Sequence, residues 1–266
     1  MNDRVSVSIA DGIAEVRLNR ADKMNALDPD MFAGINAAQE QVAADPSVRA
    51  VVLSGEGRAF CAGLDFGSFR KMGAGDSVTR NLTDRTHGIA NHAQNTAWGW
   101  RNLAVPVIAA VHGVAFGGGF QIALGADIRV VAPDTRMSVL EIKWGLIPDM
   151  AGLPLMRGLA RDDVIRDLTF TGREITGEEA LTLGFATRTA ADPKAVAMEL
   201  ARAIAGRSPH AIRAGKRVLN LCADGTDADL LMAESVEQEK LIASPNQMEA
   251  VRAGLEKRDP VFAEAG

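Results

Sequence analysis

Residues 106–127, PVIAAVHGVAFGGGFQIALGAD, say more about the fold than any other stretch of the chain. The apolar run 106–111 predicts a buried strand, and the glycines at positions 117–119 predict a tight turn into a short helix over residues 120–125. The following run at 127–132 predicts the next strand. Because strands joined by a helical crossover pair in parallel, this stretch predicts an α/β fold with a parallel or mixed sheet.

A second glycine turn, AFCAGLD at residues 59–65, follows a short apolar strand predicted at residues 50–53. A turn that ends a strand and opens a helix leaves backbone N–H groups without partners. Two such donors aimed at one point form an oxyanion hole, and Glu141 and Asp149 follow downstream as candidate proton carriers. The alternative explanation of the glycines is a tight turn where a helix packs closely on a strand.

The flanking sequence adds further strands and helices. Alternating apolar residues at 5–10 and 13–18, around an Asp-Gly pair, predict a β-hairpin. Asp28, followed by proline, predicts the start of a helix. Thr176 and Glu179 have the spacing of a capping box at another helix start.

Beyond residue 193 the pattern becomes almost entirely helical. We therefore divide the chain into an α/β region, residues 1–193, and a helical region, residues 194–266. Helices are predicted in the second region over residues 194–205, 209–222, 227–243 and 245–257.

Composition excludes several classes of protein. The 266 residues carry a net charge of −5, which gives no reason to expect nucleic acid or an anionic membrane as a partner. No apolar run has transmembrane length, and no signal peptide is evident at the N-terminus. Cys61 and Cys222 are too few for a disulfide scaffold or a four-thiolate zinc site. We expect a cytoplasmic protein without a metal.

Familiar nucleotide and hydrolase motifs are missing from the sequence. The triple glycine lacks the G-x-G-x-x-G spacing of dinucleotide-binding folds, and no G-x-x-x-x-G-K-[ST] phosphate loop occurs. Without G-x-S-x-G, a serine hydrolase would lack its nucleophile. Cys61 is expected to be a small buried residue rather than a nucleophile.

The whole chain resembles the crotonase (enoyl-CoA hydratase/isomerase) superfamily. The order and spacing of its motifs agree over nearly all 266 residues. The matching stretches are residues 20–27 (RADKMNAL), 59–65 (AFCAGLD), 106–127, 141–152 (EIKWGLIPDMAG), 171–185 (TGREITGEEALTLGF) and 256–262 (EKRDPVF).

The resemblance implies a spiral of stacked β-β-α units followed by a helical trimerisation region, with assembly as trimers or hexamers (dimers of trimers). It also implies an acyl-CoA thioester as substrate and no cofactor apart from the CoA of that substrate. The backbone amides of Leu64 and Gly118 match the two donors that hold the thioester carbonyl. The segments expected along the CoA moiety contribute Lys23, Met24, Ala62 and Asp65, although for Lys23 a solvated surface position is the alternative.

The acids distinguish between reactions of the family. Glu141 matches a catalytic glutamate, whereas Gln121 stands where hydratases carry a second glutamate and is expected to contact the substrate or a water. Because an amide cannot exchange protons, Gln121 argues against hydration. Asp149 matches the aspartate of dienoyl-CoA isomerases, or is a turn residue after Pro148. We therefore favour double-bond isomerisation (Δ3–Δ2 or dienoyl type), with enoyl-CoA hydratase and a non-catalytic acyl-CoA-binding protein as the alternatives.

Two further sets of side chains are candidates for substrate contacts. The aromatic residues considered for the acyl pocket are Phe66, Phe69, Trp98 and Trp100. The basic residues of the helical region are expected on a solvated face or at a CoA phosphate, and they are Arg213, Lys216 and Arg217.

Overall fold

A mixed six-stranded sheet forms the centre of the protein in the computed structural model, which describes residues 3–65, 67 and 82–265. The predicted hairpin pairs the first two strands antiparallel, and every later neighbour in this sheet is parallel. The strands, in their spatial order, are β1 (Val5–Ala10), β2 (Ile13–Leu18), β3 (Ala50–Gly55), β4 (Val107–Val111), β6 (Ile128–Val131) and β8 (Arg188–Thr189).

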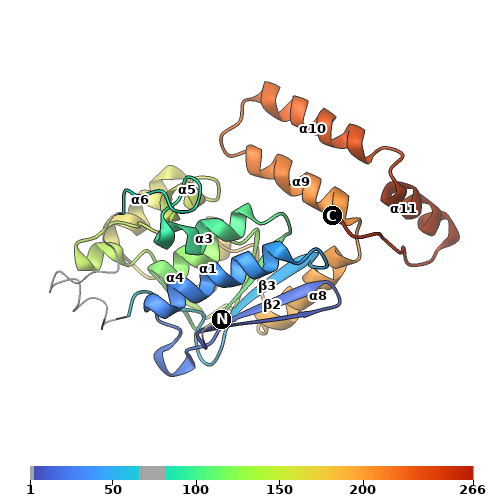
Figure 1. The fold of residues 1–266 in the computed structure, drawn as a ribbon. Helices are drawn as coiled ribbons and strands as arrows, with labels where there is room; N and C mark the ends of the chain where they lie inside the picture. Colours follow the sequence, from blue (N-terminus) through green and yellow to red (C-terminus); the bar gives the residue numbers. More distant parts are fainter. Residues whose placement is uncertain (1–2, 66, 68–81, 266) are drawn as a thin grey trace.

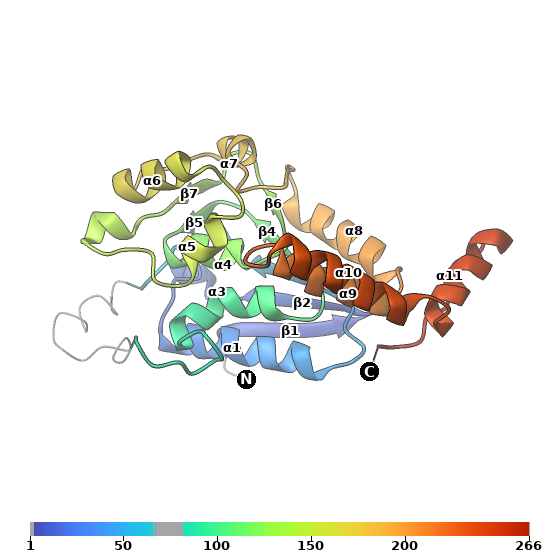
Figure 2. The same cartoon turned by 90° about the horizontal axis from the view of Figure 1, so that it is seen from above.

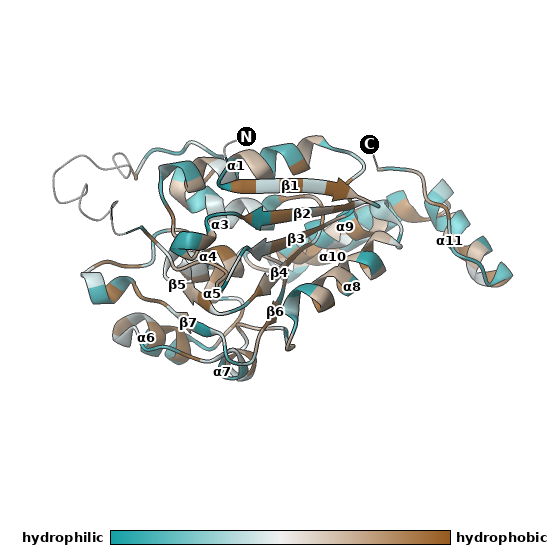
Figure 3. Ribbon diagram, turned by 90° about the horizontal axis from the view of Figure 1, so that it is seen from below, coloured by the Kyte–Doolittle hydropathy of each residue, from teal (hydrophilic) through white to brown (hydrophobic). Residues whose placement is uncertain are grey.

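Strands β3 and β4 are buried on both faces, which explains their unbroken apolar sequences. On one face, α1 (Pro29–Ala44) packs against β1 and β2, and α3 (His92–Asn102) packs on α1. On the other face, α8 (Pro193–Ala205) covers β3 and β4 (Figures 1 and 2). In Figure 3 the central strands are mostly brown, whereas the outlying helices mix brown and teal.

A small second layer follows the central sheet. Strand β5 (Val114–Phe116) comes directly after β4, pairs in parallel with β7 (Arg136–Ser138) and leads into α4 (Gly118–Leu124). The same succession occurs again: strand β6 of the large sheet is followed by the short strand β7 and then by the short 3₁₀ helix Glu141–Trp144. Each unit thus runs from a strand of the large sheet to a short strand and then a helical turn, as the β-β-α spiral predicts.

The predicted helix starts are present, with one difference. Asp28 caps α1 by accepting a hydrogen bond from the Met31 amide at 2.8 Å. Thr176 caps α7 (Gly177–Leu183) through the Glu179 amide, but the Glu179 carboxylate pairs with Arg173 at 2.7 Å instead of returning to Thr176. Only half of the predicted capping box therefore forms. Between the spiral and this helix lie α5 (Gly152–Met156) and α6 (Asp162–Thr171).

The last three helices leave the sheet. Figures 1 and 2 show α9 (Pro209–Leu221), α10 (Asp227–Leu241) and α11 (Pro245–Glu256) extending beyond the core. Helix α8 precedes them but packs on the sheet, so the boundary predicted after residue 193 lies ahead of a helix that covers the core. Among the described helices, none is both long and apolar enough to cross a membrane.

A buried ion pair ties α9 to the core. The Lys216 ammonium lies 2.8 Å from the Asp127 carboxylate and also donates to the carbonyl oxygens of Trp100 and Val105. Its side chain is 5% exposed, and burial lowers its pKa. The expectation that Lys216 lies on a solvated face is therefore wrong. Arg217 pairs with Glu237 at the surface as expected of that face.

Candidate active site

The two glycine turns lie side by side. Backbone hydrogen bonds join them in a short parallel ladder: Phe60 N–H to His112 O at 2.9 Å, Cys61 N–H to Val114 O at 3.0 Å, and Phe116 N–H to Cys61 O at 3.1 Å. This ladder extends the small second layer by one more segment. It brings together two loops that are separated by about fifty residues of sequence.

Glycines permit the close approach of the two turns. Gly63 has φ +84°, and a Cβ built there would lie 2.6 Å from the Phe116 carbonyl oxygen and 3.7 Å from the Gly118 nitrogen. A Cβ on Gly119 would lie 2.3 Å from the Cys61 carbonyl oxygen. Since backbone atoms cannot move aside cheaply, both positions require glycine for this packing.

The amides of Leu64 and Gly118 remain free to bind a ligand. The Leu27 N–H donates to the Gly63 carbonyl oxygen, and the Leu27 carbonyl oxygen accepts from the Asp65 N–H. The N–H of Leu64, which lies between these two residues, therefore points away from Leu27. Neither the Leu64 nor the Gly118 amide donates a hydrogen bond to another described residue. Both residues line one cavity of about 380 Å³.

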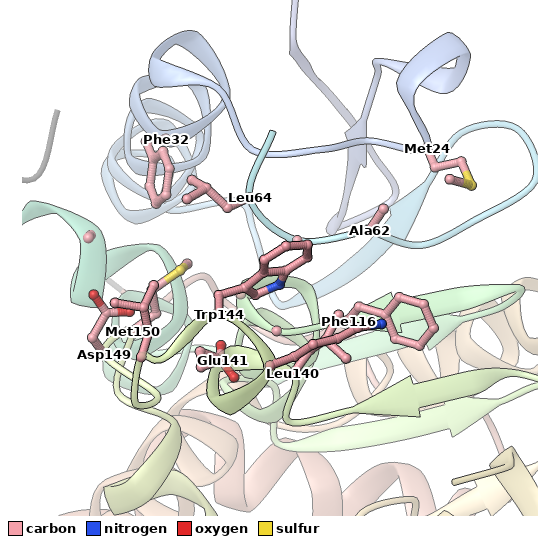
Figure 4. A pocket seen from close by; sticks show the side chains of 16 residues that line it. Met24, Phe32, Ala62, Leu64, Phe116, Leu140, Glu141, Trp144, Asp149 and Met150 are labelled. Carbon is pink, nitrogen blue, oxygen red and sulfur yellow. The ribbon is translucent and has the colours of Figure 1, made fainter. Parts of the chain in front are cut away.

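This cavity has a mostly apolar wall. In Figure 4, Phe32, Leu64 and Ala62 lie on one side and Leu140, Glu141 and Phe116 on the other, with Trp144 between them. Sequence analysis missed several lining residues: two reach the wall from α1 and α3, and the others lie within or next to the motif stretches 106–127 and 141–152. The lining residues that it missed are Phe32, Ala93, Phe116, Leu140, Lys143, Trp144, Leu146 and Met150.

The two tryptophans expected in the acyl pocket lie elsewhere. Trp100 is fully buried in the main hydrophobic core, and Trp98 packs against that core. Neither tryptophan lines the cavity as far as the described residues define it. Phe66 and Phe69 lie outside the described residues.

Glu141 is buried at the floor of the site. Its Oε1 accepts a hydrogen bond from Gln121 Nε2 at 2.6 Å, while its Oε2 is buried without a hydrogen bond to any described residue. A Cβ on Gly117 would lie 3.2 Å from Oε1, so the carboxyl lies against the same turn that presents Gly118. Burial raises the pKa of Glu141 and Asp149 adds to the effect, whereas hydrogen bonds from its own backbone N–H and from Gln121 oppose it.

Asp149 shares the cavity with Glu141. Figure 4 shows its carboxyl beside Met150 and apart from the position of Glu141. Although the residue has an exposed surface, the protein around its carboxyl group raises the pKa through desolvation. The cavity therefore contains two carboxyl groups that hold protons more tightly than they would in water.

Gln121 is oriented away from the ligand space. Its amide nitrogen donates to Glu141, and its carbonyl oxygen accepts from the Met150 and Gly152 amides, each at 2.9 Å. The residue is 1% exposed and is absent from the described lining of the cavity. The structure places it in contact with Glu141 rather than with the open space where a substrate contact was expected.

The four residues expected along CoA divide into two pairs. Met24 and Ala62 line the cavity. Lys23 is exposed in a 3₁₀ turn, and Asp65 forms an ion pair with Arg20 at 2.8 Å.

Asn25 is a structural residue beside the site that sequence analysis did not single out. It is fully buried, and its side-chain amide donates to the carbonyl oxygens of Glu56, Ala59 and Phe60. This side chain holds the loop that carries Leu64 against the 20–27 segment. Its place inside the RADKMNAL stretch was the available signal.

Cys61 and His112 have structural surroundings. Cys61 is buried, and desolvation raises the pKa of its thiol to about 12. His112 contacts the Gly57 carbonyl oxygen at 2.9 Å and so supports the turn. Within residues 3–65, 67 and 82–265, no three His, Cys, Asp or Glu side chains gather as a metal site would require.

Comparison with known proteins identifies the family of the chain. The family model for enoyl-CoA hydratase/isomerase matches residues 8–265. The chain belongs to this family. This chain is 34% identical over 260 residues to a protein of Mycobacterium tuberculosis named "Probable enoyl-CoA hydratase echA6". The alignment covers 97% of this chain and 98% of that relative.

Two more relatives of this enoyl-CoA hydratase/isomerase family member span almost the same length. Enoyl-CoA hydratase EchA19 of Mycobacterium tuberculosis is 33% identical over 251 residues, covering 93% of this chain and 91% of the relative. The crystal structure of enoyl-CoA hydratase from Bacillus anthracis superposes with a TM-score of 0.89 at 27% identity, covering 97% and 98% of the two chains. The fold is therefore the crotonase fold.

Proposed function

We propose that this family member isomerises a carbon–carbon double bond in an acyl-CoA thioester. The observation that carries the proposal is the cavity itself, in which two free backbone amides, of Leu64 and Gly118, accompany Glu141 and Asp149. The amides bind the thioester oxygen, and Glu141 is the principal base.

The reaction transfers one proton and needs no oxidant or reductant. For a 3-enoyl-CoA, Glu141 takes a proton from C2, and the electrons of the C–H bond move to the thioester oxygen as a dienolate. The two amides stabilise that charge, and loss of one such donor typically costs about 10²–10³ in rate. Glu141 then returns the proton to C4, so that the C2–C3 double bond forms as the C3–C4 double bond is lost. No cofactor beyond the CoA of the substrate is required.

The state of Gln121 supports isomerisation over hydration. Hydration needs one group to activate water and another to deliver a proton to carbon. The polar atoms of Gln121 are engaged with Glu141 and with two backbone amides, and the side chain cannot ionise. Asp149, in contrast, is an acid that reaches the same cavity.

Enoyl-CoA hydratase is the second candidate, since the relatives compared above carry that name. A substrate panel separates the two reactions. We expect turnover of 3-enoyl-CoA or dienoyl-CoA, monitored by the change in absorbance of the conjugated system. We expect little addition of water to crotonyl-CoA. Robust hydration without isomerisation would overturn the proposal in favour of a hydratase.

Glu141→Gln separates an enzyme from an acyl-CoA-binding protein. We expect this variant to lose about 10²–10⁴ in turnover, because general acid–base catalysis typically contributes that much. Its affinity for a non-reactive acyl-CoA, measured by calorimetry, should stay within a few-fold of wild type. Binding in both proteins with no turnover in either would point to a non-catalytic protein.

A further inference from the structure

The Gln121 side chain connects three parts of the site. Its carbonyl oxygen accepts hydrogen bonds from two main-chain amides, those of Met150 and Gly152, at 2.9 Å each. Those contacts fix the orientation of the amide, because a flipped side chain would face two N–H donors with its own NH₂ group. The NH₂ group must therefore point at Glu141, where it lies 2.6 Å from Oε1.

This contact makes the two oxygens of Glu141 unequal. Oε1 is held by Gln121, and Oε2 is buried with no hydrogen bond among the described residues. A carboxylate held at one oxygen keeps its plane and its rotamer, so the Gln121 contact fixes the orientation of Glu141.

Glycines enclose the arrangement. A Cβ on Gly152 would lie 2.6 Å from the Gln121 carbonyl oxygen, so a larger residue would displace one of the two loop amides. A Cβ on Gly117 would lie 3.2 Å from Glu141 Oε1. The backbone thus approaches the Gln121–Glu141 pair from two sides, and little room is left for another rotamer.

We propose, on the basis of the isomerase function above, that Gln121 is a positioning residue: its amide joins Glu141 to segment 149–152 and fixes the orientation of the Glu141 carboxylate. Gln121 does not touch the substrate. It acts through Glu141 and through the backbone that carries Asp149 and Met150.

The charged surroundings of Glu141 determine what loss of Gln121 does to its titration. Asp149 and Lys143 are the other ionisable side chains among the described residues that line the cavity. Burial raises the pKa of Glu141, hydrogen bonds from its own backbone N–H and from Gln121 lower it, and Asp149 adds to the rise. Removing that hydrogen bond should therefore make Glu141 harder to ionise.

The test compares Gln121→Met with Gln39→Met. Gln39 is a matched control because it is also a buried glutamine, 4% exposed, whose amide nitrogen donates to the carbonyl oxygens of Asn95 and Thr96, in the α1–α3 contact. Both variants lose buried hydrogen bonds of similar kind. Only Gln121→Met removes a contact with Glu141.

For Gln121→Met we expect kcat to fall about 10²-fold, since a small misplacement of a catalytic group can cost that much. KM should stay within a few-fold of wild type, because the amides of Leu64 and Gly118 are untouched. The acid limb of the kcat/KM profile should move about one unit to higher pH, as loss of a hydrogen bond to a charged group predicts. Gln39→Met should keep the wild-type kcat and pH profile. An unchanged profile in Gln121→Met, or an equal shift in Gln39→Met, would overturn the proposal.

A readout without turnover keeps this inference separate from the proposed function. Carbon-13 NMR of labelled glutamate carboxyls, with Glu141 assigned by its loss in Glu141→Gln, gives the pKa of Glu141 directly. It should rise in Gln121→Met and stay constant in Gln39→Met. If wild type fails to isomerise but the NMR pKa moves as stated, the proposed function is wrong and the role of Gln121 stands. A pKa that does not move removes that role even in an active isomerase.

Discussion

The surroundings of individual residues in the site have opposite effects on negative charge. In the proposed reaction Glu141 accepts a proton, yet its burial disfavours the ionised form and raises its pKa. In the same proposal the amides of Leu64 and Gly118, which donate to no other described residue, favour negative charge on a ligand in the cavity. A base with a raised pKa next to donors for an oxyanion is suited to making an enolate at neutral pH.

The raised pKa of Glu141 has a consequence for stability. Because the folded protein holds this proton more tightly than the unfolded chain, the contribution to stability is fully present below the unfolded pKa of 4.5 and is lost as the pH rises through the folded pKa. Because Gln cannot ionise, the Glu141→Gln variant does not lose stability in this way as the pH rises. We therefore expect the stability of the variant to improve relative to wild type as the pH rises from 4.5 toward neutrality, measured by urea unfolding. If the difference in unfolding free energy between Glu141→Gln and wild type stays constant over this pH range, the raised pKa of Glu141 would be contradicted.

Asp149→Asn tests how the two acids divide the work. The substitution keeps the shape of the side chain and removes its ability to exchange protons. We expect conversion of a 3-enoyl-CoA to stay within a few-fold of wild type, because Glu141 performs both steps of that short shift. Conversion of a dienoyl-CoA, in which the proton moves further, should fall about 10²-fold or more. Equal losses on the two substrates would argue against a division of roles.

Secondary-structure elements show which parts of the molecule local sequence determines. Patterns within a few residues predict the hairpin, the Asp28 cap and the parallel strands joined by helical crossovers. The structure contains all three. Helix α4 begins at Gly118, two residues before the predicted helix, because Gly117 turns the chain with φ +51°. That the two glycine turns meet was proposed from the turns themselves, and the hydrogen-bond ladder shows them side by side.

Contacts between distant elements could not be predicted in the same way. Phe32 and Ala93 reach the cavity from α1 and α3, and nothing in their own sequence neighbourhoods distinguishes them from other core residues. Lys216 is a basic residue on an amphipathic helix, for which a solvated position is the usual outcome. Its burial depends on Asp127, which is far away in sequence and therefore gave no local signal.

Lys216→Met tests the anchor between α9 and the core. Breaking a buried ion pair from one side typically costs about 3–5 kcal/mol, since the remaining charge loses its partner. Asp127 stays partly exposed and keeps its bond from the Val107 amide, so we expect a loss at the lower end of that range in urea unfolding. Lys240→Met, which removes an exposed pair with Glu237, is the control and should change stability by less than about 1 kcal/mol. Similar losses in the two variants would argue against the anchor.

The whole molecule has a core with one projecting helical arm. Helices α10 and α11 expose large apolar side chains, including Leu231 at 64% and Leu255 at 81%. Where exposed apolar side chains form a large contiguous patch, that patch commonly marks an interaction site. Together with the family resemblance, it supports our proposal that the chain assembles as trimers or hexamers.

Sedimentation velocity tests this proposal. We expect wild type to sediment as three or six chains, and Leu231→Asp combined with Leu255→Asp to give a lighter particle, because two charges would then lie in apolar contacts. Glu239→Gln, on the exposed surface of α10, should leave the mass unchanged. A monomeric wild type would refute the assembly.

The ladder between the two glycine turns has one more consequence, for vibrational spectroscopy. Since Phe60, Cys61 and Phe116 bond the loops to one another, the proposed donors, the amides of Leu64 and Gly118, are in position before a ligand arrives. A thioester seated between them is polarised in its ground state. The carbonyl stretching band of an unreactive, isotope-labelled acyl-CoA should thus shift to lower frequency on binding, and it should do so equally in Glu141→Gln, where no proton is removed.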